Sequence, residues 1–220
     1  MHARRLLALS AGVAAPAVAS ERDAQLWITA MAVAPVSARA EAQLDLSVRY
    51  FEDASHLGQV LVRPMVTYRV GPAVSVTGAY VYSRGDTSAG RPTHEHRALQ
   101  QAQFRLARAR GVELTARTRL EQRFQAGEGG TAFRIRQQLR GQASIGARVR
   151  AYAAYEVFLE ASGPDWGPER GVEQLRATAG ATAPLAGRLS IDLGYMSLRQ
   201  FRRGGNRVAD IALLSLVARY

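Results

Sequence analysis

Apolar and polar residues alternate with a period of two over long stretches of this chain. From Val112 to Phe124 the even positions are mostly apolar, whereas the odd positions carry glutamate, threonine and arginine. Because successive side chains of a β-strand point to opposite faces, this pattern predicts strands with one apolar and one polar face. The same alternation recurs in segments 41–50, 74–83, 133–145, 148–160, 189–195 and 210–220. The sequence therefore predicts an all-β protein.

The length of these strands and the spacing between them favour a membrane barrel. Soluble strands usually have about five or six residues, whereas a tilted transmembrane strand needs about nine to eleven. Tight links such as Gly71-Pro72 and Gly146-Ala147 alternate with longer polar loops such as those at 85–93 and 160–170. Short turns at one end and long loops at the other are typical of outer-membrane barrels. We expect an antiparallel up-and-down transmembrane β-barrel in the outer membrane of a Gram-negative bacterium.

A soluble periplasmic β-sandwich that acts as a binding module is an alternative, because period two alone does not say which face is inside. The number of strands is also open. Eleven candidate segments are present, whereas single-chain bacterial barrels have an even count. We expect ten strands from Ala38 to Tyr220, with Gln25 to Ala34 as an extra or edge segment. A count of twelve would follow if one long segment were split.

The first residues have the pattern of a secretory signal. Met1 to Arg5 is short and basic, Leu6 to Val18 is apolar, and Ala17-Val18-Ala19 supplies the small residues that signal peptidase recognises. We predict a signal peptide over 1–19 and a single barrel domain over 20–220. This export is consistent with the outer-membrane localisation.

Composition excludes several classes of chemistry. The chain has no cysteine, and all 29 of its Lys and Arg residues are arginine, giving a formal charge of +11. Disulfide scaffolds, thiolate zinc sites, cysteine nucleophiles and lysine-dependent chemistry are therefore excluded. No cofactor and no catalytic residue are implied. The basic balance fits ion pairs inside a barrel and contact with lipid and anionic lipopolysaccharide, which we expect as partners together with the barrel assembly machinery.

The polar faces of the predicted strands suggest a charge network in the lumen. Guanidinium groups and carboxylates across neighbouring strands form planar, charge-assisted pairs. We expect such a network, which fills the lumen or lines a small pore that attracts small anionic solutes. Its expected members are Arg117, Arg119, Glu121, Arg123, Arg134, Arg136, Arg148, Arg150 and Glu156, with Glu113 nearby.

Other candidate sites carry weaker signals. His94 and His96 would share one strand face, but no third metal ligand has a convincing spacing, so we expect no metal site. An outer-membrane lipid hydrolase using Ser83 or Ser88 with one of these histidines is an alternative function. Nucleic acid is not an expected partner, because a basic helix within 96–123 conflicts with the period-two pattern. The aromatic C-terminal Tyr220 fits a signal for barrel assembly.

Several short motifs occur in an order that resembles a known family. They are Gln25-Leu26-Trp27, Leu120-Glu121-Gln122-Arg123-Phe124, Arg134-x-Arg136, Tyr155-Glu156-Val157-Phe158, Gln174-Leu175-Arg176 and Leu193-Gly194-Tyr195-Met196. From about Asp23 to Tyr220 the chain resembles an uncharacterised bacterial family, domain of unknown function 2490. Glu173-Gln174 departs from an Asn-Arg pair that the family often carries, which leaves the pairing of that strand open. The resemblance implies an exported outer-membrane β-barrel without an established activity.

Overall fold

The chain folds into eleven β-strands in the computed structural model, which describes residues 21–86, 90–202 and 205–220. The strands are β1 (Glu21–Pro35), β2 (Ala40–Phe51), β3 (His56–Arg69), β4 (Val74–Gly85), β5 (Thr93–Ala109), β6 (Val112–Gln125), β7 (Ala132–Ile145), β8 (Val149–Glu160), β9 (Gly171–Ala186), β10 (Leu189–Gln200) and β11 (Arg207–Arg219). The described part of the chain contains no helix long and apolar enough to cross a membrane. The predicted signal peptide, 1–19, lies outside the described residues. The all-β prediction is confirmed.

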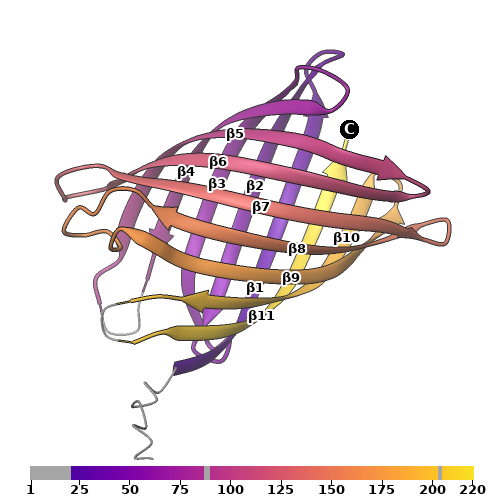
Figure 1. The fold of residues 1–220 in the computed structure, drawn as a ribbon. Helices are drawn as coiled ribbons and strands as arrows, with labels where there is room; N and C mark the ends of the chain where they lie inside the picture. The colour runs from indigo at the N-terminus through magenta and orange to yellow at the C-terminus, as the bar shows by residue number, and fades with distance from the viewer. Residues whose placement is uncertain (1–20, 87–89, 203–204) are drawn as a thin grey trace, which may run out of the picture.

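The strands form one closed barrel in which each strand pairs with its neighbours in sequence (Figure 1). All ten sequential pairs are antiparallel, as an up-and-down barrel requires. β1 closes the barrel by pairing in parallel with β11. An odd number of up-and-down strands leaves the first and last strands pointing the same way, so the closing pair must be parallel. The molecule is a single closed sheet rather than the two packed sheets of a sandwich.

The expectation of ten strands is wrong, because the segment from Gln25 to Ala34 is a full member of the barrel. Its strand, β1, pairs with β11 from Glu21 opposite Arg207 to Val33 opposite Arg219. It also pairs with β2, from Leu26 opposite Tyr50 to Pro35 opposite Glu41. A parallel ladder satisfies backbone donors and acceptors as an antiparallel one does, so an even count is not needed for closure.

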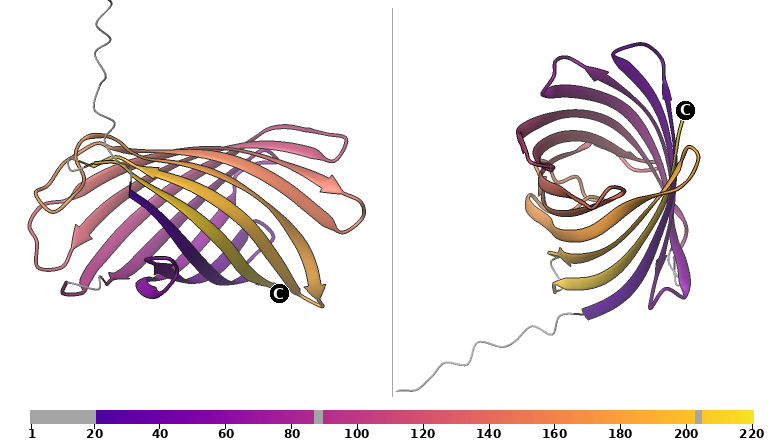
Figure 2. Two further views of the ribbon diagram at one scale, coloured as in Figure 1. Left: turned by 90° about the horizontal axis from the view of Figure 1, so that it is seen from below. Right: turned by 90° about the vertical axis from the view of Figure 1, so that its right-hand side faces the viewer.

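The two ends of the barrel differ in the length of their connections. Short turns at 36–39, 70–73, 110–111, 146–148 and 187–188 lie at one end, here called the turn end. The segments 52–55, 126–131 and 161–170 lie at the opposite loop end, together with the described residues between β4 and β5 and between β10 and β11. The predicted alternation of tight links and longer loops is confirmed for four of the five loop-end connections; the connection 52–55 has four residues, as many as the turns 36–39 and 70–73. Because the strand count is odd, β1 begins at the loop end and Tyr220 lies at the turn end (Figure 2).

The apolar faces of the strands point outward and the charged faces point inward. In β6, Arg119, Glu121 and Arg123 are buried, whereas Leu120 is 37% and Phe124 is 42% exposed. Exposed apolar side chains from the other strands form, with Leu120, an outward apolar band: Leu44, Leu46, Val66, Val76, Ile135, Leu139, Leu193 and Leu216. Soluble proteins bury such side chains and expose their charges, so this barrel has the inverse arrangement.

Candidate functional site

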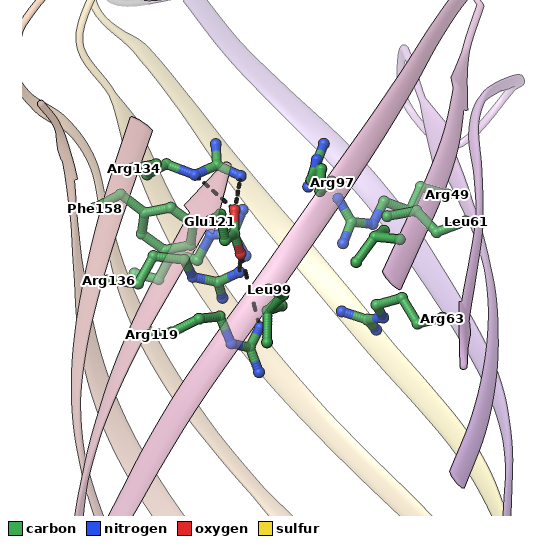
Figure 3. Close-up of a pocket in the computed structure, with 12 residues that line it drawn as sticks. Arg49, Leu61, Arg63, Arg97, Leu99, Arg119, Glu121, Arg134, Arg136 and Phe158 are labelled. Atoms are coloured by element: carbon green, nitrogen blue, oxygen red, sulfur yellow. Dashed lines mark hydrogen bonds and ion pairs between the residues drawn. The ribbon is translucent and has the colours of Figure 1, made fainter. Parts of the chain in front are cut away.

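The barrel interior holds a network of ion pairs centred on Glu121, which is 1% exposed. Arg134 donates to one carboxylate oxygen, Oε2, from Nε at 2.9 Å and from Nη2 at 2.5 Å. Arg136 donates from Nη1 to the other oxygen, Oε1, at 2.9 Å (Figure 3). Register brings these groups together, because Glu121 lies directly opposite Arg134 in the β6–β7 ladder. One carboxylate therefore holds two buried guanidinium groups.

Further carboxylates extend this network in both directions along the barrel. Towards the turn end, Glu156 on β8 accepts hydrogen bonds from Arg117 Nη2 at 2.6 Å and from Arg136 Nε at 3.0 Å. Towards the loop end, the remaining pairs are Arg123 with Glu95 at 2.6 Å, Arg123 with Glu160 at 3.2 Å, Arg97 with Glu95 at 2.7 Å and Arg134 with Glu173 at 3.1 Å. Buried charges are tolerated when they are paired in this way.

A β-bulge allows two consecutive residues of β9 to face the interior. In the β8–β9 ladder Phe158 pairs with Gln174, but Leu159 pairs with Val172, so Glu173 is the extra residue. Glu173 and Gln174 are consequently both buried, at 5% and 8% exposure. Regular alternation would have sent one of them outward. The bulge resolves the pairing of this strand, which the sequence left open.

Aromatic rings stack on several of the buried arginines. Phe158 is buried and lies under the guanidinium carbons of Arg136 and Arg176, at 4.1 and 4.2 Å from the ring centroid. Arg49 lies 3.7 Å from the ring centroid of the buried Trp27. Rings and arginines thus fill the middle of the lumen together, with the cations on the electron-rich faces of the rings.

Two adjoining cavities lie inside the barrel. A vestibule of about 630 Å³ is lined by residues from the loop end of the strands, among them Asp23, Glu52 and Gln200. Deeper in the lumen is an inner cavity of about 50 Å³, which is lined by Leu61 and Leu99 and otherwise mostly by charged groups. Four arginines line both cavities, which places the inner cavity at the floor of the vestibule: Arg49, Arg97, Arg134 and Arg176.

Most residues predicted for the charge network meet one another in the structure. Arg117, Arg119, Glu121, Arg123, Arg134, Arg136 and Glu156 all contribute to the ion pairs of the interior. Arg148 and Arg150 do not join them, because Arg148 lies in the turn before β8 and both side chains are exposed at the turn end. Glu113 is also near the turn end, where its carboxylate is 3.2 Å from Arg105 Nε.

Several residues of the network were not predicted from the sequence. Arg63, Arg97, Arg176, Glu95 and Glu160 all contribute charged groups to the interior. Period two could have found the β5 pair, because Glu95 and Arg97 are two apart and share a strand face. It could not have shown which groups meet across the lumen, such as Arg117 and Glu156, which are separated by β7.

The geometry does not support the hydrolase candidates. Ser83 is buried in the interior and accepts a hydrogen bond from Gln59 Nε2 at 2.8 Å. His94 and His96 lie on the other strand face, where their Nδ1 atoms contact tyrosine hydroxyls of β4. The wall of the barrel therefore separates Ser83 from both histidines, and Ser88 lies outside the described residues. No group of three or more metal-ligating side chains occurs among the residues that the structure describes.

The alternative of a basic helix is wrong, since residues 96–123 form parts of β5 and β6 joined by a tight turn. Trp166, in the loop between β8 and β9, donates from Nε1 to the carbonyl of Gly129 at 2.9 Å. This contact joins two neighbouring loops at the loop end. Tyr220 donates from its backbone N–H to Val33, next to the end of β1.

Comparison with known proteins identifies the family. Residues 24–209 match the model of the protein family described as protein of unknown function (DUF2490). The chain belongs to the DUF2490 family. An uncharacterised protein of Methylorubrum extorquens is 30% identical to it over 229 residues, covering 100% of this chain and 99% of the relative. No solved structure matches the chain. The resemblance seen in the sequence is therefore confirmed, and the DUF2490 match covers the barrel from β1 into β11.

Proposed function

We propose that this DUF2490 protein is an integral outer-membrane β-barrel, exported by the signal peptide over 1–19. The observation that carries the proposal is the inverted distribution of side chains in a closed barrel. An apolar exterior is favourable in lipid, and a closed sheet leaves no backbone group unpaired there. Membrane lipid covers the outward apolar band, and lipopolysaccharide contacts exposed arginines near the loop end, such as Arg84, Arg91 and Arg199.

The orientation of the barrel follows from its two ends. Outer-membrane barrels place short turns in the periplasm and longer loops outside. The turn end therefore faces the periplasm, and the vestibule opens to the exterior. Tyr220 then lies on the periplasmic side, where the barrel assembly machinery recognises it as a terminal aromatic residue.

The interior supports a small, restricted pore that favours anions. Arginines outnumber carboxylates around the inner cavity, and a low-dielectric wall strengthens their field. The inner cavity of about 50 Å³ restricts passage to small solutes. In a planar bilayer we expect small conductance steps and a reversal potential displaced towards that of the anion. A reversal potential that follows the cation, or the absence of any conductance, would contradict this part of the proposal.

Cysteine labelling tests the membrane topology directly, because the natural chain has no cysteine. Ser55→Cys places a thiol on the exposed loop between β2 and β3, and Ala147→Cys places one on the turn between β7 and β8. On intact cells a membrane-impermeant maleimide should label only Ser55→Cys. After the outer membrane is opened, both variants should react. Labelling of Ala147→Cys alone on intact cells would indicate the opposite orientation. Equal labelling of both variants in a soluble fraction would contradict the proposal.

A further inference from the structure

The wall of the inner cavity carries far more positive than negative charge. Glu121 is the one carboxylate among the residues that line it, and Arg134 and Arg136 already occupy both of its oxygens. The seven lining arginines come from six strands: Arg49, Arg63, Arg97, Arg119, Arg134, Arg136 and Arg176. All of them except Arg176 are labelled in Figure 3. Convergence of so many cations on a space of about 50 Å³ is unfavourable unless an anion joins them.

Three of these arginines lack a hydrogen-bonded carboxylate partner. Among the described residues, Arg49 and Arg176 form no ion pair, and the nearest carboxylate oxygen to Arg119 is 3.9 Å away. All three instead donate to side-chain amide oxygens: Arg49 to Gln59 at 2.7 Å, Arg119 to Gln101 at 2.6 Å and Arg176 to Gln174 at 2.8 Å. An amide oxygen accepts a hydrogen bond but cancels no charge. Arg49 and Arg176 are thus left without an ion-pair partner among the described residues, and Arg119 has only the long contact with Glu121.

Some N–H donors of the arginines that line the inner cavity also have no hydrogen-bond partner. The Nε atoms of Arg49, Arg63 and Arg176 are buried and have no hydrogen-bond partner. Arg49 stacks on Trp27, and Arg176 stacks on Phe158. Stacking occupies the flat face of a guanidinium group, whereas its N–H donors lie in the plane at the edge. The rings therefore hold these arginines in place by their faces, while the buried Nε donors at their edges have no protein partner.

We propose that the inner cavity binds a phosphate group, carried either by inorganic phosphate or by a phosphorylated solute whose remainder lies in the vestibule. A tetrahedral dianion presents more acceptor oxygens than a carboxylate does, and guanidinium groups bind them with charge-assisted hydrogen bonds. The volume of the inner cavity accommodates one such group. Arg49, Arg97 and Arg176 line both cavities and form the path by which the anion enters. This inference rests on the proposed anion-favouring pore and names the class of anion that the pore would bind.

Titration calorimetry of the folded barrel in detergent, without phosphate in the buffer, tests the proposal. Inorganic phosphate should bind saturably at one site per barrel, and acetate should bind at least about tenfold more weakly. Glycerol phosphate distinguishes the two sources: binding as tight as that of inorganic phosphate indicates a phosphorylated solute, and weaker binding indicates the free ion. Folding of every sample is checked by its altered gel mobility without heating.

Two variants and one control separate a ligand site from a structural network. Arg49→Gln and Arg176→Gln should each weaken phosphate binding by about tenfold or more. Without phosphate, their thermal stability should equal or exceed that of the natural protein, because each substitution removes a cation without an ion-pair partner among the described residues. Arg105→Gln, at the turn end beside Glu113, should leave binding unchanged.

Two results would overturn the proposed phosphate site. Absence of saturable phosphate binding to a correctly folded barrel would refute the site while leaving the membrane proposal intact. Equal affinity for acetate would refute the phosphate class. If either arginine variant does not fold, the other variant and the rise in melting temperature of the natural protein with added phosphate provide the same test.

Discussion

Replacing Glu121 by glutamine should destabilise the barrel substantially, since this residue organises the buried ion pairs. The substitution keeps the shape of the side chain but removes the charge that faces Arg134 and Arg136 at 2.5 to 2.9 Å. Removing one partner of a buried ion pair costs about 3–5 kcal/mol. Arg134 keeps Glu173 and Arg136 keeps Glu156, so we expect the lower part of that range, about 3 kcal/mol.

A glutamate on the same strand provides the matched control. Glu113 pairs with Arg105 at 3.2 Å, but the Arg105 side chain is 39% exposed at the turn end. Exposed ion pairs contribute at most about 1 kcal/mol, so Glu113→Gln should have a small effect. The free energy of unfolding is measured by urea titration of the detergent-folded proteins, with the fraction of folded protein read from unheated gels.

The same titration gives the outcome that would refute this reasoning. A loss within about 0.5 kcal/mol of zero for Glu121→Gln, or equal losses in both variants, would show that the buried carboxylate does not hold the network together. The double variant Glu121→Gln with Arg134→Gln should lose less than the sum of the two single variants, because the second change removes a cation that the first one left underpaired.

Three further predictions concern the outward apolar band, the packing of the strands and the processing of the chain. Leu139→Arg, in the middle of the outward apolar band, should lower the free energy of unfolding in lipid bilayers by about 2–4 kcal/mol. Leu106→Arg, near the turn end, should lower it by only about 0–1 kcal/mol. Similar small losses for both variants would indicate a water-exposed surface. Gly180→Ala should cost about 1–3 kcal/mol in the urea titration, because its Cβ would meet a tyrosine hydroxyl and a backbone carbonyl at 2.6 Å. Gly141→Ala, whose Cβ would meet nothing within 4 Å, should be neutral, and equal effects would contradict this packing. The intact mass of the protein from outer membranes should match a chain that begins at Ser20, and retention of the first residues would contradict the predicted cleavage.

The alternation of side chains predicted the strands well where one face is charged. In β6 the contrast between Leu120 and its charged neighbours identified both the strand and its inward face. The segment of β1 was also among the eleven candidate strands, and it was excluded from the count of ten only because single-chain bacterial barrels have an even number of strands. Trp27 points inward there and packs with Met196, Leu198 and Ile211, so the inward face of this strand is partly apolar.

The charge network could be predicted only in part, for a similar physical reason. Period two gives the face of a strand on which Arg134 or Glu156 lies, but it carries no information about partners on strands that are not adjacent in sequence. The bulge at Glu173 shifts the register by one residue, which sequence alternation does not reveal. Arg148 was assigned to the network because the pattern did not show that β8 begins one residue later, at Val149.

Gel heat-modifiability of an isolated outer-membrane fraction is the measurement that shows whether this barrel spans the outer membrane. Unheated and boiled samples are compared side by side in mild detergent. A band that is enriched in that fraction and changes mobility on boiling is the predicted result, because a closed barrel resists the detergent until it is heated. Protein recovered only in the soluble fraction, with the same mobility in both samples, would contradict the account.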